Sequence, residues 1–238
     1  YRGGVWSQLI PAAELSLLRQ LARRYQISDF MLLHAVFSVL LARLGNDSDV
    51  VIGTPLAQRN QPELSRLMGV FLNTLVLRLD LSANPSLVQL LQQVKAVQLD
   101  AHQHAAMPFE KLVEMLNPQR SLSYHPWFQI MFSFRQQVGS GPRFNRLDCS
   151  VDDSPAGIAK FDLTLDVVQC DEKIVLNWEF DTALFAPATI SSLAQSYNRL
   201  LQQLLLQPEA QLATLPLAEF VVPAVYTDKQ PYHSLLSR

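Results

Sequence analysis

One carboxamide interrupts an apolar run in the first third of the chain. In the stretch MGVFLNTLVLR, Met68 to Arg78, alternation places Asn73 on the same side of a predicted strand as Phe71 and Leu75. The other side is apolar as well, which is typical of a strand covered on both faces. A buried amide without a partner costs roughly 1–3 kcal/mol. We therefore expect Asn73 either to tie down neighbouring backbone or to position a group in an active site.

The histidines and cysteines do not form a recognisable metal or nucleophile set. His34 lies in an apolar helical stretch and is expected in the core, whereas His125 precedes Pro126 and is expected in a turn. His102 and His104 are two positions apart on a predicted helix, so they point in different directions and make a poor metal pair. The chain has no serine nucleophile elbow, no phosphate-binding glycine loop and no zinc-ligand spacing. We expect no metal site.

Composition restricts the class of protein. The 238 residues are 49% hydrophobic, with a formal net charge of −2, which argues against nonspecific nucleic-acid binding. Cys149 and Cys170 form no CxxC motif and are expected to be reduced, half-buried thiols. The longest apolar run, Phe30 to Ala42, is too short to span a bilayer. We expect a cytoplasmic protein without membrane contact.

Hydrophobic periodicity predicts alternating helices and strands. Helices are expected from Pro11, from Ser28 to Gly45, from Ser86 to about His104, over Phe109 to Leu116, and from Pro187. Strands are expected at Val50 to Leu56, at the Asn73 stretch, at Trp127 to Arg135, and in a hairpin of Lys160 to Val168 with Lys173 to Phe180. A short strand is also expected near Phe144 to Val151. This pattern predicts an α/β fold with a central sheet and helices packed against it.

Several motifs, in order, resemble conserved segments of one family. MGVFLNTLVLR and the later HQHAAMPFEKLV are similar to segments of the condensation domains of nonribosomal peptide synthetases, and DVVIGTPLAQRNQPEL, QRSLSYHPWFQIMFSF, AKFDLTLDV and WEFDTALFAPATI are similar to others. The resemblance covers about residues 1 to 206. It implies a chloramphenicol acetyltransferase-like lobe, a mixed sheet flanked by helices, which is half of a V-shaped domain around a tunnel.

The family's catalytic signature is absent. That signature is two adjacent histidines followed after three residues by Asp-Gly, whereas this chain has neither adjacent histidines nor an Asp-Gly dipeptide. The chain is therefore expected to be the C-terminal lobe, residues 1–207, followed by a linker toward another domain, residues 208–238. No catalytic residue is expected in it, and alone it should be inactive.

The resemblance implies a reaction and its partners. Such domains form an amide bond between aminoacyl or peptidyl thioesters held on the phosphopantetheine arms of donor and acceptor carrier proteins, and no cofactor is expected to bind this chain directly. The expected partners are the N-terminal lobe, both carrier proteins and an adjacent adenylation domain. This lobe would supply a tunnel wall and the acceptor-side docking surface. One or both of the irregular segments Gln58 to Arg66 and Val138 to Gly157 are expected to cross to the other lobe and close the tunnel.

Five residues are candidates for these roles. Asn73 is the candidate for the tunnel. Arg78 and Arg120 could join the lobes by charge-assisted hydrogen bonds, and His102 matches the family's histidine but could equally be a packing residue at a helix end. Asp162 belongs to a polar row with Lys160, Thr164 and Asp166 that faces either solvent or the tunnel.

Other functions remain open from the sequence. A non-catalytic scaffold that binds carrier proteins is compatible with every motif in the chain. An epimerization domain of the same fold is disfavoured because its glycine- and tyrosine-rich string does not follow the Asn73 region. A heterocyclization domain is disfavoured because the chain keeps Pro108-Phe109-Glu110.

Overall fold

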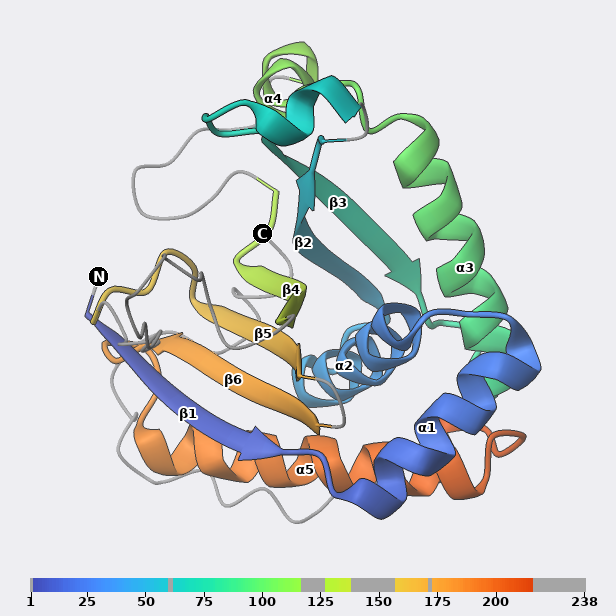
Figure 1. The fold of residues 1–238 in the computed structure, drawn as a ribbon. Coiled ribbons are helices and arrows are strands. Elements are labelled where there is room, and N and C mark those ends of the chain that lie inside the picture. The colour runs from blue at the N-terminus through green and yellow to red at the C-terminus, as the bar shows by residue number, and fades with distance from the viewer. Residues whose placement is uncertain (1, 60–61, 117–126, 138–156, 171–172, 216–238) are drawn as a thin grey trace, which may run out of the picture.

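A computed structural model describes residues 2–59, 62–116, 127–137, 157–170 and 173–215, which form a mixed sheet with helices packed on one face (Figure 1). The strands are β1 (Gly3–Leu9), β2 (Asp49–Ala57), β3 (Leu72–Asp80), β4 (Ile130–Gln137), β5 (Leu163–Cys170) and β6 (Lys173–Asp181), in the spatial order β1-β6-β5-β4-β2-β3. Strand β4 runs parallel to β2 and β5, and the other neighbours are antiparallel. The predicted α/β architecture is confirmed.

The helices build the core on one face of this sheet. They are α1 (Ala12–Tyr25), α2 (Asp29–Gly45), α3 (Leu87–Gln103), α4 (Phe109–Leu116) and α5 (Pro187–Leu206), with short 3₁₀ turns η1 (Pro62–Arg66) and η2 (Leu212–Thr214). Figure 1 shows α3 alongside β3 and α5 beneath β1 and β6. Helix α2 lies at the centre, and its residues from 32 to 41 are all buried. The Trp178 indole of β6 meets Phe37 of α2 and Tyr197 of α5 edge-on, with ring centroids 5.8 and 5.6 Å apart.

The helix ends follow local rules that the sequence predicts. The Ser28 hydroxyl accepts a hydrogen bond from the Met31 amide at 3.2 Å and so caps α2. Ser86 and Gln89 form a reciprocal capping box at the start of α3. Asn46 ends α2 in the left-handed region, with φ 50°. The predicted bounds of α4 and the predicted start of α5 at Pro187 are confirmed.

Three expectations about the strands need correction. The prediction that the Asn73 strand is covered on both faces is wrong, because Leu72 and Arg78 on its open face are exposed, Leu72 to 64%. Strand β1 is not predicted by the sequence pattern. Strands β4 and β5 begin about three residues later than expected, at Ile130 and Leu163, because the preceding residues lie outside the strand ladders. The short strand expected near residues 144–151 lies outside the described residues.

The segment after α5 packs on the helices as far as residue 215. Leu212 and Leu215 are buried in the core, and the Arg43 guanidinium of α2 donates hydrogen bonds to both of their carbonyl oxygens. The first residues of the predicted linker therefore lie against the domain. Residues 216–238 lie outside the described part.

No single helix in the described part of the chain combines the length and apolar composition needed to cross a membrane. Helices α1 and α2 meet that test only as a pair, which is bent by 106°.

Candidate functional site

Asn73 joins the motif MGVFLNTLVLR to the motif HQHAAMPFEKLV. Its carboxamide nitrogen donates to the carbonyl oxygens of Ala105 at 3.0 Å and Met107 at 2.7 Å. Its carboxamide oxygen accepts from the Phe109 amide at 3.0 Å. The side chain is buried, with 8% of its surface exposed. Asn73 therefore clamps the connector between α3 and α4, and only one acceptor lone pair of the amide is left for another group.

Gln58 reinforces this clamp from the end of β2. Its amide nitrogen donates to the same Ala105 carbonyl oxygen at 2.5 Å, so two side chains converge on one backbone group. The connector itself turns tightly, since the Met107 amide donates to the His104 carbonyl at 3.0 Å. The sequence analysis does not identify Gln58 as a site residue. Its position at the end of a predicted strand, close to the Asn73 strand, is the signal that could have indicated it.

The Asn73 clamp and an aromatic cluster lie on opposite faces of the β2–β3 pair. The antiparallel register places Asn73 and Ile52 on the helix-covered face, and Gly53 on the opposite face. On that open face the buried Phe128 ring lies against Gly53 and contacts Phe109 and Phe161, with centroid distances of 5.9 and 5.5 Å. The start of α4 is thus held by a polar contact from one face and by an aromatic contact from the other.

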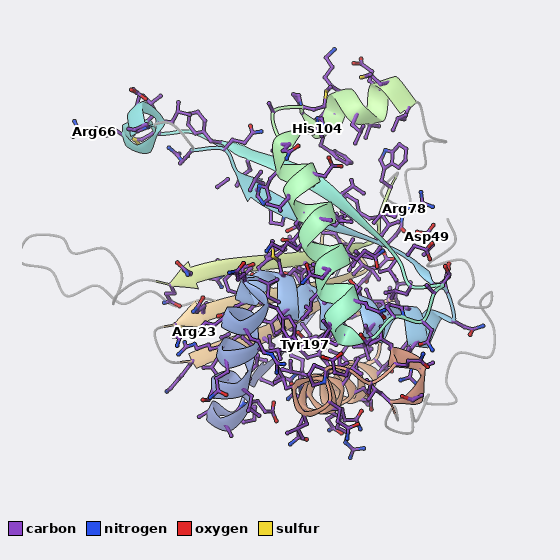
Figure 2. All side chains as sticks on the ribbon, turned by 90° about the vertical axis from the view of Figure 1, so that its right-hand side faces the viewer. Arg23, Asp49, Arg66, Arg78, His104 and Tyr197 are labelled. Carbon is purple, nitrogen blue, oxygen red and sulfur yellow. The ribbon has the colours of Figure 1, made fainter. Side chains whose placement is uncertain are left out.

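Arg78 pairs within its own hairpin. Its guanidinium donates two hydrogen bonds of 2.8 Å to the two carboxylate oxygens of Asp49 (Figure 2). This hydrogen bond raises the pKa of Arg78. Both side chains are exposed, 72% and 44%, and exposed ion pairs add little to stability. The pair is accessible to a partner, but in this structure it joins β2 to β3.

The other candidates lie apart from Asn73. His102 is exposed on the last turn of α3, and the His104 ring lies 3.8 Å from the Asp100 carboxylate beside it. Figure 2 shows His104 near the end of α3, with η1 and Arg66 projecting from the helical body. Arg120 lies outside the described residues, as do His125 and Cys149.

Asp162 stands at the open face where β5 begins. It is half-buried, and burial together with the neighbouring Asp181 carboxyl raises the pKa of Asp162 to about 6. The Asp181 amide donates to the Asp162 carbonyl at 3.1 Å, which brings the two residues together. The Asp181 carboxylate is buried and accepts from the Ala183 amide at 2.9 Å. The sequence placed both acids in similar motifs but did not predict that they are neighbours.

The polar row predicted around Asp162 crosses the open face of the sheet. Its Asp166 carboxylate accepts hydrogen bonds from the Ser133 hydroxyl and from the Arg135 guanidinium, the latter at 3.2 Å. On the next strands Ser7 donates to the side-chain oxygen of Asn177 at 2.8 Å. The side chains of Asp166, Ser133, Arg135, Ser7 and Asn177 therefore each have a partner. Within the described residues no group of three His, Cys, Asp or Glu side chains could hold a metal ion.

Comparison with known proteins decides the family. The family model described as "Condensation domain" matches residues 2–220. The chain belongs to the condensation-domain family. The dimodular nonribosomal peptide synthase of Bacillus subtilis (strain 168) is 39% identical over 206 residues, which are 83% of this chain and 9% of that protein. The condensation-domain chain thus spans a small part of the curated relative it matches.

Solved structures agree on the fold of this condensation-domain chain. The holo form of AB3403, a four-domain nonribosomal peptide synthetase bound to AMP and glycine, superposes with a TM-score of 0.84 at 25% identity, over 91% of this chain and 18% of that one. The complex of the X-domain and OxyB from teicoplanin biosynthesis gives a TM-score of 0.82 at 27% identity, over 90% of this chain and 48% of that one. The Asn73 clamp and the open sheet face therefore belong to a condensation-domain fold.

Proposed function

We propose that this chain is one lobe of a condensation domain that forms amide bonds during nonribosomal peptide synthesis. The observation that carries the proposal is the condensation-domain match over residues 2–220, together with relatives that are peptide synthases. The amine of an acceptor aminoacyl thioester would attack the carbonyl of a donor thioester, and the thiol of the donor's phosphopantetheine arm would leave. Holding both substrates on tethers supplies proximity, which is worth roughly 7–11 kcal/mol of the barrier.

The catalytic histidine of this reaction would come from chain outside these 238 residues. His34 is buried among aromatic rings, His102 is exposed on the last turn of α3, and His104 is exposed directly after that helix. The absence of adjacent histidines and of Asp-Gly in the sequence supports the same proposal. The lobe would then contribute the tunnel wall around Asn73 and part of the acceptor-side docking surface.

Several finer assignments follow from this proposal. The partners would be an N-terminal lobe, donor and acceptor carrier proteins and an adenylation domain, with residues 208–238 as a linker toward the last of these. Arg78, His102, Arg120 and Asp162 are proposed contacts to the other lobe or to the tunnel. The accessible Arg78–Asp49 pair and the half-buried Asp162 support this role. The site of action would be the cytoplasm.

The test compares this chain with the full-length protein that contains it. Each is mixed with donor and acceptor substrates loaded on carrier proteins, and the amide product is followed by mass spectrometry. The full-length protein should give product, and the isolated chain should give none above the uncatalysed background. Turnover by the isolated chain would contradict the lobe assignment.

A non-catalytic binding lobe is the second candidate. One observation favours it: a similar solved structure, the X-domain, was determined in complex with another protein, OxyB. In that case the full-length protein would bind loaded carrier proteins without forming product. A binding measurement added to the product assay distinguishes this candidate from the catalytic one.

A further inference from the structure

The contact between Gly53 and Phe128 is unusually close. A Cβ atom built on Gly53 would lie 2.2 Å from the nearest ring carbon of Phe128, with two further ring carbons at 2.4 and 2.6 Å. No side chain larger than hydrogen can stand at this position while the ring keeps its place. Strand β2 thus provides a bare backbone surface on which the Phe128 ring lies, and the ring is 2% exposed.

The Phe128 ring in turn supports the first turn of α4. It meets the Phe109 ring at an interplanar angle of 66°, in the edge-to-face arrangement that aromatic pairs favour. Helix α4 contains no buried residue, and Met115 and Leu116 at its far end are 71% and 57% exposed. The position of α4 therefore depends strongly on the contacts made at Phe109.

Phe109 connects this aromatic support to the Asn73 clamp. The Phe109 amide is the donor to the Asn73 carboxamide oxygen, while the Phe109 ring rests on Phe128. A change at Phe128 would consequently shift the amide that orients Asn73. Phe128 also contacts Phe161, which directly precedes the half-buried Asp162.

We propose that Phe128, seated on Gly53, is a positioning residue for the condensation reaction. It holds the first turn of α4 and, through the Phe109 amide, the orientation of the Asn73 carboxamide. This inference rests on the proposed function. Because it acts on the orientation of Asn73, it predicts an effect on the chemical step and little effect on the binding of carrier proteins.

The test uses the full-length protein with Phe128→Leu and a matched control, Phe132→Leu. Phe132 is fully buried on the neighbouring strand β4, but it packs on the helix-covered face against Phe30 and Phe37. Both variants lose comparable buried volume and should show similar losses in melting temperature. Well below that temperature, Phe128→Leu should lower the single-turnover rate constant about tenfold, with the KM for either carrier protein changed less than about threefold, and Phe132→Leu should keep the normal rate.

A double variant tests the role of Gly53. Gly53→Ala alone should be slow and destabilised, because its methyl group collides with the ring. Leucine at 128 lacks the two ring atoms that lie closest, so adding Phe128→Leu to Gly53→Ala should restore part of the lost stability. Equal rates for Phe128→Leu and the wild type, or strictly additive losses in the double variant, would overturn the proposal.

Hydrogen exchange separates this inference from the proposed function. Amides of residues 107–112 should lose protection in Phe128→Leu and keep it in Phe132→Leu, whether or not the protein condenses substrates. Absence of product from the wild-type protein would contradict the proposed function alone. Unchanged protection at residues 107–112 in Phe128→Leu would contradict the positioning role alone.

Discussion

Two regions of the molecule hold polar groups in different surroundings: the apolar core around α2 and the open face of the sheet. On the helix-covered face both ring nitrogens of His34 and the indole nitrogen of Trp178 are buried without a hydrogen-bond partner in this structure. On the open face Asp166, Ser133 and Asn177 are only half-buried, and each has a partner. In this core dense apolar packing supplies the stability, and each unpaired polar atom lowers it. On the open face the polar groups are half-exposed and bond one another across neighbouring strands.

Among the variants considered, replacement of Trp178 should lower the stability of the protein most. Trp178→Ala should lower the free energy of unfolding by about 3–5 kcal/mol, because it leaves a cavity between α2, α5 and the sheet. Chemical denaturation monitored by circular dichroism measures this loss. Trp6 is the matched control, since it pairs with Trp178 in register but is 40% exposed. Trp6→Ala should cost less than half as much, and equal losses would contradict the central place of Trp178 in the packed core.

A second variant concerns the buried imidazole. Desolvation lowers the pKa of His34 to about 3, so the folded protein keeps it neutral while the unfolded chain takes up a proton below about pH 6.5. Stability should therefore fall by a few kcal/mol as the pH drops from about 6.5 toward 3. His34→Leu should remove this part of the acid sensitivity, and denaturation midpoints across that range measure it. The exposed His102→Leu is the control, and an equal change there would contradict the assignment to His34.

The smallest change in stability is expected for two acids of the open face, Asp162 and Asp166, whose replacement should act in opposite directions. Since the folded-state pKa of Asp162 is raised to about 6, its contribution to stability is full below about pH 3.8 and is lost as the pH rises through about 6. Asp162→Asn should thus stabilise the protein at pH 8, by about 1 kcal/mol after allowance for solvent screening of a half-exposed group. Asp166→Asn should destabilise it slightly, because it weakens the contacts to Ser133 and Arg135. Melting temperatures measured at pH 8 and pH 5 test this. At pH 8 the melting temperature should rise for Asp162→Asn and fall for Asp166→Asn, and a change in the same direction for both variants would contradict the prediction.

Local signals allowed much of the helical structure to be predicted. The bounds of α4, the serine caps of α2 and α3 and the proline start of α5 are set by residues within one turn of each helix end. The β5–β6 hairpin was equally predictable because its partners are close in sequence. These elements were predicted correctly for the same reason: their determinants are local.

Features that depend on distant partners were not predictable. Strand β1 contains two glycines and shows no clear alternation, and it forms only by pairing with β6, as in Gly3 with Asp181. The amide of Asn73 was expected to have partners, but these are backbone groups of residues 105 to 109, which only the folded chain brings near.

Asn73 provides the most direct test of the account, because it connects the fold to the proposed reaction. In the full-length protein, Asn73→Ala removes three hydrogen bonds to the α3–α4 connector. The control is Asn198→Ala, which removes a half-buried asparagine of α5 whose side-chain oxygen accepts a hydrogen bond from Gln8. Melting temperature and the single-turnover rate of amide formation are measured on the same samples, with the rate taken well below the melting temperature.

The expected result is a rate at least about tenfold lower for Asn73→Ala, which corresponds to ~1.4 kcal/mol at the transition state, and a nearly normal rate for Asn198→Ala. Asn73→Ala with a lower melting temperature but a normal rate would contradict the account, because the clamp would then support the fold without positioning the reaction.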